Sequence, residues 1–203
     1  ILPKVDTIIH LAAKVTTPFA NDDPHYFEQV NHWGTAELVY AAEKNDLQKF
    51  IYLSSAAVYG YTDDIVDETY IPSPKTAYAI SKLRGESHVE RLQSKMSAII
   101  LRCGNVYGYS PSMRFDAVLN RFVFESFFYR KISINGSGEQ QRAFIHLNSV
   151  VNIIADILKV DIESGVYNLV TENTSINKIA LQLKDLLSDL DILYLNQHIK
   201  FNS

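Results

Sequence analysis

The stretch "AYAISK" at residues 77–82 carries a tyrosine and a lysine four positions apart in a segment with helical periodicity. Side chains at this spacing share one face of a helix, where a lysine is normally stabilised by a carboxylate. Tyr78 offers Lys82 no such charge. The pair therefore raises the question of whether a phenol and an ammonium group act together in chemistry.

A serine upstream extends the pair to a proton-transfer set. The stretch "YLSSAAVYG" at 52–60 follows an apolar run and brings Ser54 and Ser55 to its end. A tyrosine, whose pKa is ordinarily about 10, becomes a better base when a nearby ammonium group favours the phenolate. Tyr78 could then take a proton from a carbinol as hydride leaves, while Ser55 positions the same oxygen. Tyr-x-x-x-Lys alone also occurs by chance, so the hypothesis depends on the serine.

Short apolar runs alternate with segments of helical periodicity along the chain. Strands are expected at 5–13, 49–55, 97–108, 132–134, 142–147, 165–171 and 192–196, and helices at 25–45, 77–95, 115–130, 149–159 and 175–188. This alternation predicts an α/β fold with a parallel sheet covered on both faces, so that 5–13 reads as a strand buried on both sides. The long loops 14–24 and 60–76 follow strands at their carboxyl ends, where such sheets bind ligands.

The composition excludes several classes of partner. The 203 residues are 47% hydrophobic and 21% charged, which suits one large globular domain or one and a half small ones. A net charge of −4 without a long basic stretch argues against nucleic acid, and no apolar run approaches the roughly 20 residues of a membrane span. A single cysteine and no visible signal peptide predict a cytoplasmic protein. The abrupt start at "ILPKVDTIIHLAA" predicts a fragment lacking both termini.

Six stretches together resemble the extended short-chain dehydrogenase/reductase family, in its branch of nucleotide-sugar epimerases and dehydratases. They are "IIHLAA", "VNHWGT", "YLSSAAVYG", "YAISK", "LRCGNVYG" and "RAFIHLNSVV". The resemblance implies a Rossmann-type doubly wound sheet for NAD at 1–110 and a small nucleotide-sugar domain covering most of 111–203, some of whose segments return to the first domain. The family's glycine-rich phosphate loop lies upstream of this chain, so NADP is not excluded.

The same resemblance implies roles for individual residues. Tyr78 corresponds to the catalytic base, Ser55 to the catalytic serine or threonine, and Lys82 to the residue that also holds the nicotinamide ribose. The expected cofactor-binding residues are Leu11, Ala12, Ala13, Ser55, Tyr78, Lys82 and Gly104.

On the substrate side, Asn105 corresponds to an asparagine that touches the sugar diphosphate. Arg142 corresponds to an arginine that neutralises it, a role that the guanidinium fork suits. Asn135 replaces an aromatic residue that relatives often place against the nucleobase, which leaves the identity of the base open. No metal site is expected, because His10 and His146 lie in apolar strands without further ligands at metal spacing.

Three functions fit these residues: an NAD-dependent nucleotide-sugar 4-epimerase, a nucleotide-deoxysugar 4-ketoreductase using NAD(P)H, and a dinucleotide-binding protein without turnover. The 4,6-dehydratases of the family carry an acid pair after the catalytic serine or threonine, as Thr-Asp-Glu. Here Ala56 and Ala57 occupy those positions, which disfavours dehydration.

Three further expectations concern packing and assembly. Relatives dimerise through a four-helix bundle, so helices 25–45 and 77–95 predict a homodimer, with Leu38, Val39 and Val89 shared between core and interface. Asn31 is expected to tie a loop to its helix, and Cys103 to be buried in a strand.

Overall fold

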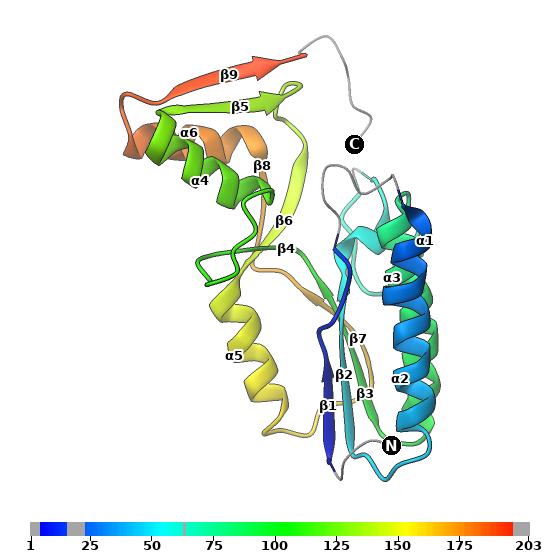
Figure 1. Ribbon diagram of the computed structural model, residues 1–203. Coiled ribbons are helices and arrows are strands. Elements are labelled where there is room, and N and C mark those ends of the chain that lie inside the picture. Colours follow the sequence, from blue (N-terminus) through cyan, green and yellow to red (C-terminus); the bar gives the residue numbers. More distant parts are fainter. Residues whose placement is uncertain (1–4, 16–22, 63, 197–203) are drawn as a thin grey trace. The chain divides into compact units, whose positions relative to one another are not determined.

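The computed structural model describes residues 5–15, 23–62 and 64–196 (Figure 1). They belong to two compact units. The first lies within Ile1–Cys103 and Ile154–Leu169, and the second within Gly104–Ile153 and Val170–Ser203. The division falls inside helix α5 (Leu147–Ile157). No helix among the described residues is long and apolar enough to cross a membrane.

The first unit contains the predicted parallel sheet. Its strands are β1 (Thr7–His10), β2 (Lys49–Ser55), β3 (Ser97–Cys103) and β7 (Gly165–Leu169), in that order and all parallel. The expectation that the first strand is buried on both faces was wrong. Within the described part of the chain β1 lies at the sheet edge, with Ile9 37% exposed and Leu11, just beyond it, 52% exposed.

The helices predicted at 25–45 and 77–95 lie side by side on one face of this sheet (Figure 1). The first is continuous but changes geometry, from α1 (Pro24–Phe27) through the π-helical turn η2 (Glu28–Trp33) to α2 (Gly34–Ala42). The second is α3 (Ala77–Glu90), which ends in the 3-10 turn η4 (Arg91–Ser94).

Apolar side chains between these helices and the sheet form the core of the first unit. Val39 and Val89 are fully buried there with Phe50 and Tyr52, so the expectation that both valines also reach a dimer interface was wrong. Gly85 lets α3 approach β2 closely, since a Cβ atom at this position would lie 2.4 Å from the hydroxyl of Tyr52. The close approach brings the polar face of α3 onto the end of β2.

Among its described residues the second unit contains two small sheets, two helices and the first part of α5. Strand β6 (Gln141–His146) pairs with β4 (Asn105–Tyr107) in parallel and with β8 (Glu172–Ser175) in antiparallel orientation, and β5 (Lys131–Asn135) pairs with β9 (Asp191–Leu195). Helices α4 (Val118–Tyr129) and α6 (Ile176–Leu186) pack against them. The shared core contains Phe122, Ile132, Ile134, Phe144, Ile176, Ile179, Ala180 and Leu190.

Candidate functional site

Ser55 lies where β2 ends and the short 3-10 helix η3 (Ala56–Tyr59) begins. Its Oγ accepts a hydrogen bond of 3.2 Å from the backbone N–H of Ala57, as an N-cap residue does. The bond fixes the side chain at the carboxyl end of a parallel strand and leaves the hydroxyl hydrogen for a donor role. The role of Ser55 in holding a substrate oxygen stays a prediction.

Tyr78 and Lys82 lie one turn apart at the start of α3. The Oγ1 of Thr76 caps this helix by accepting a 3.1 Å hydrogen bond from the N–H of Ala79, so Tyr78 falls in the first turn. The positive end of the helix dipole favours negative charge in that turn. The ring of Tyr78 packs edge-on against Phe27, with ring centroids 6.2 Å apart.

Lys82 is almost completely buried, at 2% exposure. Its Nζ lies 4.1 Å from the centre of the Tyr52 ring, a cation–π contact. Burial lowers the pKa of Lys82 to about 8, although the charge of Glu86 opposes this shift. The sequence predicts Lys82 as a functional residue but contains no evident signal for the aromatic ring beneath it.

Glu86, one further turn along α3, forms a buried ion pair with Arg102 of β3. The Arg102 Nη2–Glu86 Oε2 distance is 2.8 Å, and the two side chains are 5% and 1% exposed. Glu86 also accepts a short hydrogen bond from the hydroxyl of Ser54. The guanidinium of Arg102 stacks on Tyr59, 4.8 Å from the ring centre. Two strand ends and η3 are thereby tied to the helix that carries Tyr78 and Lys82.

Sequence reasoning missed this ion pair, although two signals were present. Arg102 is a charged residue inside an otherwise apolar strand, and a buried charge requires a partner. Glu86 stands four residues after Lys82.

Buried polar contacts also fix the segment after β1. The ring Nε2 of His10 is hydrogen-bonded to the Oγ1 of Thr35 at 2.9 Å, and burial lowers the pKa of His10 to about 4. The Asn31 side chain is bonded to both the N–H and the carbonyl of Lys14, at 2.7 and 2.9 Å, and to Ser81 on α3. Asn31 therefore ties a loop to the helices, as the sequence predicted.

The remaining cofactor candidates fall into both units. Leu11 and Ala12 are exposed and Ala13 is half-buried, directly after β1 in the first unit. Gly104 belongs to the second unit, where a Cβ atom would lie 2.9 Å from the carbonyl oxygen of Ala143. Close backbone packing thus accounts for this glycine, and its predicted role at the nicotinamide stays a prediction.

The substrate candidates Asn105 and Arg142 lie in the second unit. The side-chain amide of Asn105 donates a 3.0 Å hydrogen bond to the carbonyl of Ala143. Arg142 lines a cavity of about 210 Å³. The other lining residues are Val118, Arg121, Phe122, Ile134, Asn135, Gln140 and Ile176. The cavity therefore combines apolar walls with two guanidinium groups and two side-chain amides.

Cys103, which was not assigned a chemical role, is consistent with a structural role. Cys103 is buried at 5% exposure, and burial raises its pKa to about 12. A thiol in this state is a poor nucleophile. Within 5–15, 23–62 and 64–196, no group of three or more His, Cys, Asp or Glu side chains could hold a metal ion.

A comparison with known families matches residues 1–169 to the NAD dependent epimerase/dehydratase family. The chain belongs to this family. The resemblance drawn from the sequence motifs is confirmed at this level, as is the Rossmann-type α/β fold. The exposed Leu11 and Ala12, directly after β1, fit the dinucleotide that the family's name implies, since ligands of parallel sheets bind at the carboxyl ends of the strands.

Individual relatives have different activities. The human dTDP-D-glucose 4,6-dehydratase is 33% identical over 190 residues, which are 92% of this chain and 54% of the human protein. The UDP-N-acetylglucosamine 4-epimerase of Methanobrevibacter ruminantium is 26% identical with a TM-score of 0.86, covering 98% of this chain and 65% of that one. The UDP-glucuronic acid 4-epimerase of Bacillus cereus, solved with UDP-glucuronic acid and NAD, is 26% identical with a TM-score of 0.83, covering 94% and 62%.

The chain thus spans about half the length of the curated relative described here. The sequence disfavoured dehydration because alanines stand at positions 56 and 57, but the similarity to a dehydratase does not support that exclusion. The structure does place both alanines in the opening turn of η3, which contains no acidic residue. An acid needed for elimination can come from another segment of a chain, so two positions cannot decide the reaction.

Proposed function

We propose that the protein is an NAD-dependent nucleotide-sugar 4-epimerase. The observation that carries the proposal is the combination, within one unit, of a capped helix start bearing Tyr78, a buried Lys82 with a lowered pKa, and a fixed Ser55 at a strand end. Membership of the family and structural similarity to two 4-epimerases support it.

In the proposed mechanism Tyr78 removes the proton from the C4 hydroxyl of the sugar while Ser55 donates a hydrogen bond to the same oxygen. Bound NAD would accept the hydride released from C4. Lys82, one turn further along α3, would favour the phenolate of Tyr78, and the charge of Glu86 and the face of the Tyr52 ring both favour its ammonium form. In the reverse direction Tyr78 would return the proton to the C4 oxygen as the acid, with Ser55 still bonded to that oxygen.

Arg142 is proposed to neutralise the diphosphate of the substrate, and Asn105 to contact it. Their support is the family resemblance and, for Arg142, its position on a cavity with a polar side. NADP in place of NAD, and a 4-ketoreductase in place of an epimerase, use the same Ser55, Tyr78 and Lys82.

Replacement of Tyr78 by Phe tests the base. We expect turnover to fall below detection while nucleotide-sugar still binds, because only the proton acceptor is removed. Ser55→Ala should reduce the rate less, by about 10²–10³-fold. The measurement is product formation by NMR on a panel of UDP-, dTDP- and GDP-hexoses, with the exposed Tyr129→Phe as control. Full activity in Tyr78→Phe would contradict the mechanism.

The same panel separates the reaction types. An epimerase yields the C4 epimer with NAD retained through purification, whereas a reductase consumes exchangeable NAD(P)H. The second candidate, a 4,6-dehydratase, is favoured by the similarity to the human enzyme and would give a 4-keto-6-deoxy-sugar. Accumulation of that keto product in place of an epimer would overturn the epimerase assignment.

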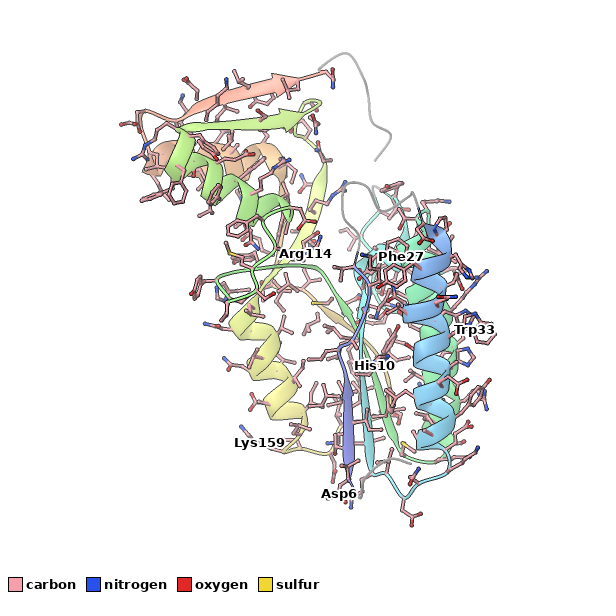
Figure 2. All side chains as sticks on the ribbon, in the orientation of Figure 1. Asp6, His10, Phe27, Trp33, Arg114 and Lys159 are labelled. Atoms are coloured by element: carbon pink, nitrogen blue, oxygen red, sulfur yellow. The ribbon has the colours of Figure 1, made fainter. Side chains whose placement is uncertain are left out.

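We also propose that the protein forms a homodimer through the outer face of α2 and α3. Trp33 projects from the helices on the side away from the sheet (Figure 2) and is 55% exposed, and Tyr40 of α2 is 36% exposed. Large aromatic side chains are common at the centres of interfaces. Light scattering at micromolar concentration should give twice the monomer mass, and Trp33→Glu should yield monomers. A monomeric parent protein would refute the proposal.

A further inference from the structure

The cavity of the second unit contains a second arginine that the sequence did not single out. Arg142 comes from β6 and Arg121 from α4, and both line the same space of about 210 Å³. Two guanidinium groups around one small cavity repel each other unless an anion lies between them. Their shared cavity therefore suits an anionic ligand.

The contacts of Arg121 leave part of its hydrogen-bonding capacity unused. Its Nη2 donates a long bond of 3.4 Å to the carbonyl of Ser133. Its Nε lies 3.9 Å from Glu125 Oε1, too far for a hydrogen bond, and this buried Nε–H has no acceptor among the described residues. The other carboxylate oxygen of Glu125 is likewise buried without a donor in the described part of the chain.

Arg142 has no carboxylate partner among the described residues. Its one hydrogen bond there runs from Nη1 to the carbonyl of its neighbour Gln141, at 3.1 Å. The two arginines thus differ in one respect: Arg121 has a nearby carboxylate at i+4 on its own helix, and Arg142 has none. Any anion entering the cavity meets Arg142 directly but shares Arg121 with Glu125.

We propose that Arg121 is the second guanidinium of the diphosphate site and that Glu125 is its competing counter-ion in the ligand-free protein. The inference rests on the proposed role of Arg142 as a diphosphate-binding residue. A nucleotide-sugar carries one negative charge on each phosphate, so two arginines match it. Bidentate guanidinium–phosphate bonds are stronger than the loose contact with Glu125, because they are shorter and charge-assisted. Glu125 therefore sets the affinity without touching the ligand.

Calorimetry with UDP and with uridine tests the assignment. Arg121→Met should weaken UDP binding by about tenfold to a hundredfold, the usual loss for one hydrogen bond to a charged group, and leave uridine binding unchanged. Glu125→Gln should tighten UDP binding about two- to fivefold, the size of a half-exposed ion pair. Arg130→Met is the matched control, because Arg130 follows the same helix and is paired with Asp189 at 3.3 Å.

Each result has a definite meaning. UDP binding by Arg121→Met as tight as in the parent protein, or an equal loss for uridine, overturns the inference alone. Weaker binding of UDP by Glu125→Gln overturns the role of Glu125. Loss of NAD binding in Arg121→Met with UDP binding intact would assign the arginine to the cofactor instead and also overturn it. If the parent protein binds none of UDP, dTDP and GDP, the proposed function fails together with this inference. Circular dichroism of each variant checks that it is folded.

Discussion

The two units of the molecule differ in how deeply their charged side chains are buried. In the first, the Glu86–Arg102 pair and Lys82 are buried beneath the end of the sheet, with 1–5% of each side chain or residue exposed. In the second, Arg121 is 37% exposed with Glu125 Oε1 3.9 Å from its Nε, and Arg142 is half-buried with no carboxylate partner among the described residues. Buried, closely paired charges hold other groups in place, whereas more exposed charges that are loosely paired or unpaired are suited to binding.

The difference also follows from the kind of element that carries each charge. Glu86 lies on helix α3 and Arg102 on the central strand β3. The helix and strand pack against each other, so neither side chain can turn toward water. A buried ion pair lacking one partner leaves an uncompensated charge in a medium of low polarity. The arginines of the second unit can turn toward water instead, so their loss should affect binding and hardly affect folding.

Glu86→Gln is expected to have the largest effect on stability. Loss of the carboxylate charge leaves Arg102 buried without its counter-ion, which costs about 3–5 kcal/mol. Glu43→Gln is the matched surface control, since its partner Arg91 is 47% exposed and such pairs contribute about 1 kcal/mol or less. Arg121→Met should likewise change stability by less than about 1 kcal/mol. Urea unfolding measures the stability of all three variants. Equal losses for Glu86→Gln and Glu43→Gln would show that the buried pair contributes no more to stability than the surface pair.

A smaller effect is expected from His10 as the pH falls. Burial lowers its pKa to about 4 in the folded protein, while the unfolded chain has a pKa near 6.5. The unfolded state therefore binds more protons between these values, and stability is lost as pH drops from about 6.5 to about 4, by at most about 3 kcal/mol. His10→Gln should flatten the pH dependence of the unfolding free energy in this window. An unchanged slope would show that other groups cause it.

Much of the first unit was predictable because its signals are local. The run 49–55 was predicted as a strand and coincides with β2, and the helix predicted from residue 77 begins there in α3. Burial of continuous apolar runs and capping by Thr76 act within a few residues, so a sequence pattern reveals them. Strand β8 was missed, because "ENTS" is polar and is stabilised by its pairing with β6 rather than by its own pattern.

The sequence by itself determined the family and the parallel sheet. It also determined that Tyr78 and Lys82 share one face of a helix, since four residues make about one turn whatever surrounds them. Only the tertiary structure decided what surrounds these residues. The ring of Tyr52 under Lys82, the pairing of Glu86 with Arg102, and the cavity shared by Arg121 and Arg142 join side chains from different elements. Such contacts depend on how helices pack on strands, which residue spacing does not encode.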